Sequence, residues 1–240
     1  MPPKPGSVTL AGAGPGDPEL LTLKALRALE SADVILYDSL VPAEILALAR
    51  PESEKISVGK MGYGPSCRQD DINALMIAHA RAGKHVLRLK GGDPLIFSRA
   101  GEELLAAKEA GIPVEIIPGI TAAQAAAAAL GVPLTHRLHA RRLQYVTGHD
   151  HKGGLPTNID WKALADPGAT TIIYMAKKTL AAFSQTVQEH GLPPETPAVA
   201  IINATLPTQH IIKGTIATLP GKMDSAPAGP VTVLIGKALT

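Results

Sequence analysis

Short apolar runs alternate with helical patterns along the chain, and this alternation constrains the fold more than any other feature of the sequence. It is typical of an α/β protein, in which helices cover a sheet. In the first half, the predicted strands are Ser7–Ala11, Val34–Tyr37, His85–Leu89 and Val114–Ile117. The predicted helices there are Pro18–Leu29, Asp70–Ala82, Gly101–Ala110 and Thr121–Leu130.

In the second half the strands follow one another more closely, with hairpin-like connections. They are predicted at Leu143–Thr147, Thr170–Met175, Ala198–Ile202, His210–Thr215 and Val231–Ile235, with a helix at Thr179–His190. These connections predict a mixed sheet, whereas the first sheet should be mainly parallel. A boundary near Pro118–Gly119 then gives two α/β domains, residues 1–118 and 119–240, with an active-site cleft between them.

Composition excludes several classes of function. A hydrophobic fraction of 45% and a charged fraction of 18% describe a soluble globular protein. Aromatic residues make up only 3% and the net charge is +2, so we expect no nucleic-acid partner. The single cysteine, Cys67, fits a reducing compartment. Neither Met1–Gly6 nor the alanine-rich Thr121–Leu130 suits a signal peptide or a membrane span, so the expected location is the cytoplasm, away from membranes.

The segment Lys90-Gly91-Gly92-Asp93-Pro94 follows a predicted strand and precedes a predicted helix. A glycine pair lets the backbone approach a ligand closely, because no Cβ stands in the way. The Asp93 carboxylate would repel a phosphate, but it suits a ligand that carries a cation or hydroxyl groups. The loop therefore favours a cofactor outside the common nucleotide-binding folds. The plainer alternative is that Asp93 caps the following helix.

A second loop, Gly12–Asp17, looks at first like a dinucleotide-binding fingerprint. Asp17 stands at the third glycine position and Pro15 lacks an N–H, so a pyrophosphate and a nicotinamide-dependent oxidoreductase are disfavoured. A third unusual loop, Pro118-Gly119-Ile120, follows the strand Val114–Ile117. Ligands of open α/β sheets gather outside the carboxyl ends of the strands, and three such loops favour a binding site over plain tight turns.

Together these segments closely resemble the tetrapyrrole (corrin/porphyrin) methyltransferases, over nearly the whole chain. The resemblance implies the cofactor S-adenosylmethionine, released as S-adenosylhomocysteine, a small tetrapyrrole substrate and a homodimer. It rests on motifs in the same order: Gly12–Pro18, Tyr37–Val41, Gly59-Lys60, Leu89–Pro94, Arg99–Glu103, Pro118–Ala122, Pro133–Arg137, Val146–His149, Tyr174-Met175 and Gly229-Pro230.

Three of these motifs, Tyr37–Val41, Gly59-Lys60 and Pro133–Arg137, look like the uroporphyrinogen-III C-methyltransferase branch of the family. That branch methylates two pyrrole carbons of uroporphyrinogen III in succession and gives precorrin-2, on the routes to sirohaem and cobalamin. The alternatives are another acceptor within the same fold (a later precorrin, diphthine or ribosomal RNA) and a tetrapyrrole carrier without catalysis.

The resemblance also implies which residues form the cofactor pocket. Three positions depart from the family pattern: Ser98, Ala100 and Ala204 stand where glycines are usual, which requires an unstrained backbone there. Without the family, Ile96 and Met175 would be interpreted equally well as core residues. The implied S-adenosylmethionine pocket comprises Pro15, Gly91, Gly92, Asp93, Ile96, Thr121, Ala122, Met175 and Ala204.

Methylation at carbon leaves a cationic ring that must lose a proton, so a general base is expected. Asp38 is the first candidate, with Lys60 as the proton donor. Glu102 is a competing base, one helical turn from Arg99. Arg99 and Arg137 are assigned to the substrate carboxylates, because a guanidinium binds a carboxylate through a bidentate fork. A surface ion pair is the alternative interpretation of Arg99 and Glu102.

The segment His149-Asp150-His151 could suggest a metal pair. No further cysteine or histidine cluster completes a four-ligand site at a recognisable spacing. Methyl transfer from a sulfonium needs no metal, so none is expected.

Overall fold

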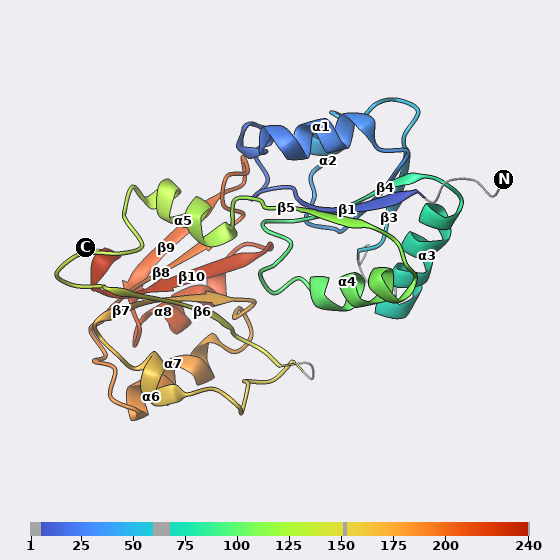
Figure 1. The fold of residues 1–240 in the computed structure, drawn as a ribbon. Coiled ribbons are helices and arrows are strands. Elements are labelled where there is room, and N and C mark those ends of the chain that lie inside the picture. The colour runs from blue at the N-terminus through green and yellow to red at the C-terminus, as the bar shows by residue number, and fades with distance from the viewer. Residues whose placement is uncertain (1–5, 60–67, 151–152, 240) are drawn as a thin grey trace. The chain divides into compact units, whose positions relative to one another are not determined.

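The computed structural model describes residues 6–59, 68–150 and 153–239. The chain divides into an N-terminal unit, Met1–Thr121, and a C-terminal unit, Ala122–Thr240. Each unit contains one sheet covered by helices (Figure 1). The predicted α/β architecture, with a parallel first sheet and a mixed second sheet, is confirmed.

The sheet of the N-terminal unit has the strand order β3-β2-β4-β1-β5. Every neighbouring pair in it runs parallel, so the carboxyl ends of all its strands meet at one edge. Parallel neighbours require long crossover connections, which helices supply here. The strands are β1 (Ser7–Gly12), β2 (Val34–Tyr37), β3 (Glu54–Ser57), β4 (His85–Lys90) and β5 (Val114–Ile117).

Helices cover both faces of this sheet (Figure 1). One face packs against α1 (Leu23–Ser31) and α2 (Ala43–Leu46), and the other packs against α3 (Gln69–Arg81) and α4 (Ala100–Glu109). Successive side chains of a strand point to opposite faces. Leu87 and Leu89 of β4 accordingly belong to the cluster beneath α1 and α2, and Val86 belongs to the cluster beneath α3 and α4.

The sheet of the C-terminal unit has the order β6-β7-β10-β8-β9. The pair β6 and β7 is parallel, and the remaining neighbours are antiparallel. Since β10 runs opposite to both β7 and β8, these two strands share a direction and end at the same edge. The strands are β6 (Arg142–Thr147), β7 (Ala169–Tyr174), β8 (Pro197–Ile202), β9 (His210–Thr215) and β10 (Val231–Ile235).

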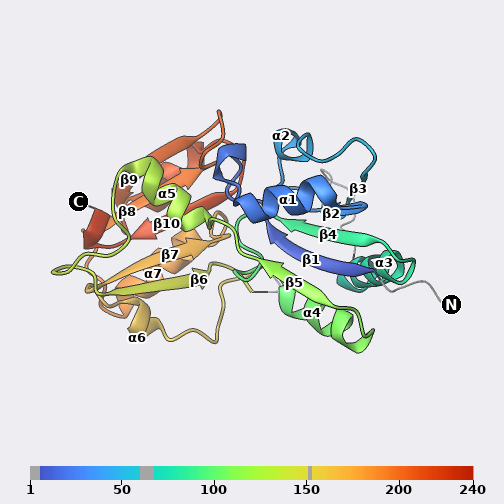
Figure 2. The same cartoon turned by 45° about the horizontal axis from the view of Figure 1, so that its top comes forward.

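This second sheet is also covered on both faces (Figure 2). The alanine-rich helix α5 (Ala122–Leu130) lies on one face, against Ile172, Val199 and Leu234. The opposite face packs against α6 (Trp161–Leu164), α7 (Leu180–Glu189) and α8 (Leu219–Lys222), around the fully buried ring of Phe183. Small alanine side chains let α5 approach the sheet closely.

Predicted and observed elements differ most near the first glycine-rich loop. The helix predicted at Pro18–Leu29 consists of a short 3-10 helix, Pro18–Leu20, and then α1. The Ala25 N–H donates to the Thr22 Oγ1 at 3.1 Å, so Thr22 acts as the N-cap from which α1 starts. The turn-sized helices α2, α6 and α8 and the strand β3 were not predicted, because segments this short show little periodicity.

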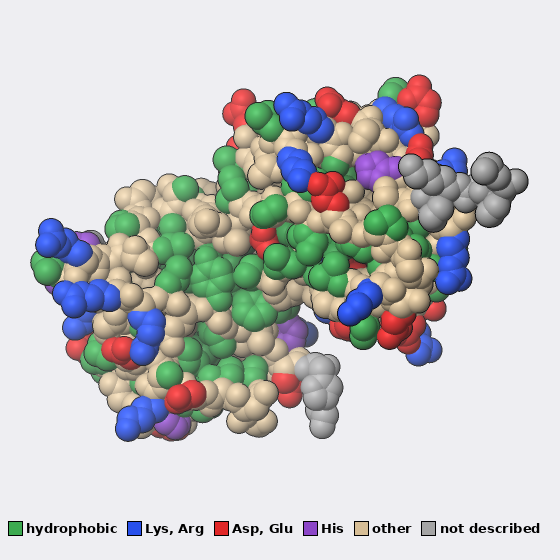
Figure 3. All heavy atoms as spheres, viewed as in Figure 1, with side chains coloured by type: hydrophobic (Ala, Val, Ile, Leu, Met, Phe, Trp, Pro, Cys, Tyr) green, Lys and Arg blue, Asp and Glu red, His purple; other side chains and the backbone are tan. Residues whose placement is uncertain are grey.

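The surface carries charges of both signs. In the view of Figure 3, acidic and basic side chains are interspersed over α1 and around α3 and α4. Lys and Arg side chains gather at the end of the C-terminal unit where the segment between α5 and β6 lies. Among the described residues, no helix has the length and apolarity that crossing a membrane requires.

Candidate active site

Three glycines join the loops that follow β1, β4 and β5. A Cβ added at Gly12 would lie 2.4 Å from the Gly92 carbonyl oxygen and 2.7 Å from the Cα of Gly119. A Cβ added at Gly119 would lie 2.2 Å from the same oxygen. Gly14 and Gly92 also exchange backbone hydrogen bonds of 3.1 and 2.7 Å. The three loops therefore pack backbone against backbone, which only glycine allows.

Asp93 ties two of these loops together. The Gly119 N–H donates to its Oδ2 at 2.9 Å, and the Leu95 N–H donates to its Oδ1 at 2.8 Å. The second contact is the local turn expected of a capping aspartate, whereas the first crosses from the β4 loop to the β5 loop. A carboxylate has about four acceptor positions, so two remain for a ligand with hydroxyl or ammonium donors.

Asp38 joins the next pair of loops, after β2 and β4. The Gly91 N–H donates to Asp38 Oδ2 at 3.1 Å, and the Leu40 N–H donates to Oδ1 at 2.9 Å. A Cβ added at Gly91 would lie 2.8 Å from the Cβ of Leu40, so this contact also depends on a glycine. Asp38, Gly91, Gly92 and Asp93 are thus brought together at the carboxyl edge of the parallel sheet.

Arg99 and Glu102 form an ion pair at the start of α4. Arg99 Nε donates to Glu102 Oε1 and Arg99 Nη2 to Oε2, both at 2.7 Å, with more than half of each side chain exposed. The Arg99 hydrogen bonds hold the pKa of Glu102 below its ordinary value, so the carboxylate is a weak proton acceptor here. This geometry is the surface ion pair considered as the alternative for these two residues.

A buried ion cluster lies beneath the Gly91-Gly92 loop, and the sequence did not predict it. Glu103 of α4 is fully buried, and its carboxylate accepts from Arg88 Nε at 2.9 Å and from Lys90 Nζ at 2.9 and 3.0 Å. Gln69 Nε2 of α3 donates to the same carboxylate at 3.3 Å. Two cations at alternate positions of an otherwise apolar strand were the available signal, because both must face the same side of the sheet.

Two of the residues predicted in the C-terminal unit, Met175 and Ala204, lie at one edge of its sheet. Met175 follows β7 and Ala204 lies in the loop after β8, and these two strands end at the same edge. Met175 has a φ of 58°, a left-handed conformation that is uncommon for a side chain of this size. Its carbonyl oxygen lies 3.1 Å from His149 Nδ1, in the loop after β6. Non-glycine residues in this conformation are found preferentially at functional sites.

Arg137 lies on an exposed turn between α5 and β6. Its carbonyl oxygen accepts a hydrogen bond from Arg141 Nε at 2.9 Å. The rings of His136 and His139 stack with centroids 4.6 Å apart, which shapes the turn. The turn presents guanidinium groups to solvent, where they could bind carboxylates.

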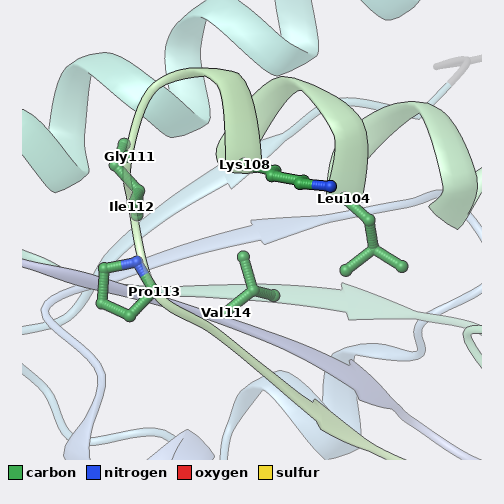
Figure 4. A pocket seen from close by; sticks show the side chains of 6 residues that line it. All are labelled: Leu104, Lys108, Gly111, Ile112, Pro113 and Val114. Atoms are coloured by element: carbon green, nitrogen blue, oxygen red, sulfur yellow. The ribbon is translucent and has the colours of Figure 1, made fainter.

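A surface hollow lies at the amino edge of the parallel sheet in the N-terminal unit (Figure 4). It is lined by Leu104 and Lys108 of α4, by residues 111–113 of the connection that follows, and by Val114, the first residue of β5. Its walls are mostly apolar, and Lys108 is its charged residue. Ligands of α/β sheets bind at the opposite edge, so this hollow is not the candidate site.

The donor set at the carboxyl edge decides which ligands fit. Two carboxylates, Asp38 and Asp93, stand in the loops, and Pro15 supplies no N–H. The Gly14 N–H donates to the Gly92 carbonyl oxygen and the Gly92 N–H donates to the Gly14 carbonyl oxygen, so neither N–H is available to a phosphate. The edge therefore suits a ligand with a cation and hydroxyl groups, as expected from the sequence, and it suits a phosphate poorly.

A match to one family model along most of the chain shows which family the chain belongs to. The model of the family described as Tetrapyrrole (Corrin/Porphyrin) Methylases matches residues 7–220. The chain belongs to this family. The resemblance inferred from the motifs is therefore confirmed.

Individual tetrapyrrole methylases and related proteins match nearly all of the chain. The siroheme synthase of Chromobacterium violaceum is 46% identical over 235 residues, which cover 98% of this chain and 50% of that protein. The S-adenosyl-L-methionine-dependent uroporphyrinogen III methyltransferase of Arabidopsis thaliana is 45% identical over 236 residues, or 98% and 64%. The chain thus spans about half the length of the siroheme synthases that it matches.

Among solved structures, uroporphyrin-III C-methyl transferase from Thermus thermophilus, in complex with S-adenyl homocysteine, has a TM-score of 0.84. Its sequence is 38% identical, and the match covers 98% of this chain and 99% of that one. The two folds therefore correspond from end to end.

The departures from the usual glycines of this family are compatible with the backbone. Ala204 has no positive φ, whereas its neighbours Asn203 and Thr205 have φ values of 52° and 72°. Likewise Arg99 has a φ of 61°, while Ser98 and Ala100 beside it have none above zero. The unstrained backbone that a side chain requires is present at all three positions.

The remaining predicted residues are placed as follows. Pro15 lies between Gly14 and Gly16, and the Ile96 N–H donates to the Asp93 carbonyl at 3.3 Å. Thr121 ends the N-terminal unit and Ala122 begins α5. Lys60, Cys67 and His151 lie outside the described residues. In the part of the chain that is described, His, Cys, Asp and Glu form no group of three or more that could hold a metal ion.

Proposed function

We propose that this chain transfers methyl groups from S-adenosylmethionine to two pyrrole carbons of uroporphyrinogen III, giving precorrin-2 through precorrin-1. The observation that carries the proposal is the end-to-end match with the Thermus thermophilus uroporphyrin-III C-methyl transferase. The identity of 45% with the Arabidopsis thaliana uroporphyrinogen III methyltransferase supports the same acceptor. The siroheme synthases are about twice as long, so the proposal concerns methyl transfer alone.

The loops of the N-terminal unit fit the proposed cofactor. S-adenosylmethionine carries a sulfonium, an ammonium and ribose hydroxyls, and when bound it supplies an activated methyl group. Asp93 has acceptor positions left for hydroxyl or ammonium donors, and the glycine contacts fix where that carboxylate lies. We assign the pocket to Pro15, Gly91, Gly92, Asp93, Ile96 and Thr121 of the N-terminal unit, with Ala122, Met175 and Ala204 from the C-terminal unit.

The main contribution of the protein is alignment. The methyl group of the cofactor is already activated by the sulfonium, so the protein need not generate an electrophile. The loops must hold the methyl donor and the pyrrole carbon in line and exclude water. Well-oriented reactants gain roughly 7–11 kcal/mol from positioning alone. The backbone-on-backbone packing of Gly12, Gly92 and Gly119 leaves little freedom for the loops to shift, which suits this task.

Proton removal is assigned to Asp38, with Lys60 as the proton donor. The Gly91 and Leu40 amides fix both oxygens of Asp38, so the carboxylate is oriented before substrate binds. Glu102, the competing base, is held by Arg99 in a bidentate pair that stabilises its ionised form. The contrast between these two environments favours Asp38.

The substrate carries eight carboxylates, and we assign their binding to Arg137 and Arg99. Arg137 lies on an exposed turn next to further arginines. In this structure Arg99 Nε and Nη2 both donate to the Glu102 carboxylate. To bind a substrate carboxylate through the same N–H groups, Arg99 must share them with Glu102 or release Glu102. Arg137 is therefore the stronger assignment.

The deciding experiment is an anaerobic incubation of the purified protein with uroporphyrinogen III and methyl-labelled S-adenosylmethionine, followed by mass analysis of the tetrapyrrole. A gain of two labelled methyl groups is expected. Binding of S-adenosylhomocysteine without methyl transfer would contradict this acceptor and move the activity to a later precorrin, diphthine or ribosomal RNA. A chain that binds the tetrapyrrole but not S-adenosylhomocysteine would be a carrier.

A further inference from the structure

Beneath the Gly91-Gly92 loop, the cluster of Arg88, Lys90 and Glu103 has two cations and one carboxylate, so it carries a net positive charge. At most 5% of any of these three side chains is exposed. Arg88 alone would neutralise Glu103, and its Nη1 also donates to the Leu36 and Leu89 carbonyls, both at 3.3 Å. Lys90 adds a second buried positive charge, and burying an ion without a countercharge is costly.

Burial opposes the charged form of Lys90. Burial, followed by the charge of Arg88, lowers the pKa of Lys90, and Glu103 and then Asp38 oppose that shift. An ammonium has three N–H donors, and the contacts with Glu103 account for two hydrogen bonds. The second cation therefore is not explained by Glu103 alone.

The strand register places Asp38 beside Lys90, at the end of the neighbouring strand. β2 and β4 are adjacent, with Leu36 opposite Arg88 and Tyr37 opposite Leu89, so Asp38 continues β2 opposite the end of β4. Leu36 faces α3 and α4, and Asp38, two residues further, follows the same side. The groups around Lys90 are then Arg88 of β4, Glu103 of α4, uncharged Gln69 of α3 and Asp38, with exposed Glu102 further out.

We propose that Lys90 is a positioning residue for Asp38: its ammonium, hydrogen-bonded to Glu103, is a buried positive charge that attracts the Asp38 carboxylate at its position beside the Gly91 amide. With Asp38 included, two cations (Arg88 and Lys90) and two carboxylates (Glu103 and Asp38) leave the four groups with no net charge. This inference rests on the proposed function only for its catalytic consequence, since the charge pairing itself is a property of the folded chain.

A double-mutant cycle in stability tests the pairing without any turnover. The free energy of unfolding would be measured by urea denaturation for the wild type, Lys90→Met, Asp38→Asn and the double variant. Asp38→Asn leaves Lys90 without its countercharge, so it should raise the unfolding equilibrium constant about tenfold more in the wild type than in the Lys90→Met background. The lost hydrogen bonds of Asp38 are common to both arms and cancel.

A coupling above about threefold supports the pairing, and a smaller coupling overturns it. Lys55→Met is the matched control, because Lys55 is an exposed lysine of β3 in the same sheet. Combined with Asp38→Asn it should show no coupling. If Lys90→Met does not fold, Lys90→Gln, which keeps a polar side chain, takes its place in the same cycle.

A second readout tests positioning for catalysis. In Lys90→Met, kcat for methyl transfer should fall about tenfold or more, while the Kd for S-adenosylhomocysteine stays within about twofold. A purely structural role would lower stability without changing kcat at saturation, and that result would overturn the positioning role. If the wild type methylates no uroporphyrinogen III, the proposed function fails, but the stability cycle still decides the pairing.

Discussion

At the scale of single residues, Asp93 combines two tasks that substitution can separate. Asp93→Ala removes the acceptor for the Gly119 and Leu95 amides together with the charge, whereas Asp93→Asn keeps one acceptor oxygen. We expect Asp93→Ala to weaken S-adenosylhomocysteine binding about tenfold or more, roughly 1.4 kcal/mol, and Asp93→Asn to lie between it and the wild type.

Isothermal titration calorimetry would measure this change in affinity. Asp71→Asn, at an exposed position of α3, is a matched control and should bind like the wild type. An unchanged Kd in Asp93→Ala would remove Asp93 from the cofactor pocket.

The two candidate bases can be told apart by comparing variants that remove only the charge. Asp38→Asn should lower kcat about 100-fold or more, the usual contribution of a positioned base. Glu102→Gln should keep kcat within about twofold, because Glu102 is already held by Arg99. Steady-state kinetics at saturating substrate would measure both. The reverse pattern would make Glu102 the base.

Residues in loops that follow strands could be located from the sequence, but their partners could not. Glycine and aspartate motifs identify Gly91, Gly92 and Asp93 as a close-approach loop, since these residue types act locally. The alternate spacing of Arg88 and Lys90 places both cations on one side of β4, but their pairing with Glu103 joins α4 to β4 through tertiary packing, which periodicity does not predict. Lys60 lies outside the described residues, so its assigned role stays a prediction.

At the scale of elements, Asp33 connects the starts of β2 and β4. The His85 N–H donates to Asp33 Oδ2 at 2.8 Å, and Arg50 pairs with Oδ1. The hydrogen bond from His85, with a further contribution from Arg50, lowers the pKa of Asp33 below 3.8. Since the folded state favours the ionised form, its stabilising effect is present above pH 3.8 and disappears as the pH falls through the folded value.

Asp33→Asn should therefore reduce the free energy of unfolding at about pH 7 by roughly 1 kcal/mol, a modest value because the pair is partly exposed. The difference from the wild type should shrink when urea denaturation is repeated near pH 3 or below. A difference that stays constant with pH would show that the charge of Asp33 does not contribute.

The elements that were predicted are those with strong local signals. β2, β5, β9 and β10 have the bounds that the sequence predicts, because each contains β-branched residues in a short run bounded by turn residues. β3 carries exposed Glu54 and Lys55 at the edge of the sheet, and its pairing with β2 rather than its composition makes it a strand. The break before α1 depends on the Thr22 cap, which a longer helical pattern concealed.

At the scale of the whole molecule, we expect a homodimer, as the family resemblance implies. The chain has a mass of 24.9 kDa, so a dimer has twice that mass. Size-exclusion chromatography with light scattering, over a range of protein concentrations, would measure it. A mass of 24.9 kDa at every concentration would contradict the prediction. Fractionation of the native cells would test the expected cytoplasmic location.

The contact among Gly12, Gly92 and Gly119 also bears on how such a molecule can evolve. A side chain at Gly12 or Gly119 would collide with backbone, so most variants there would be lost through misfolding before any change in substrate could be selected. These glycines would persist in a descendant that had exchanged one acceptor for another. These glycines therefore indicate common descent of the scaffold. Changes of methyl acceptor must arise at other positions, where a side chain can be exchanged without a collision.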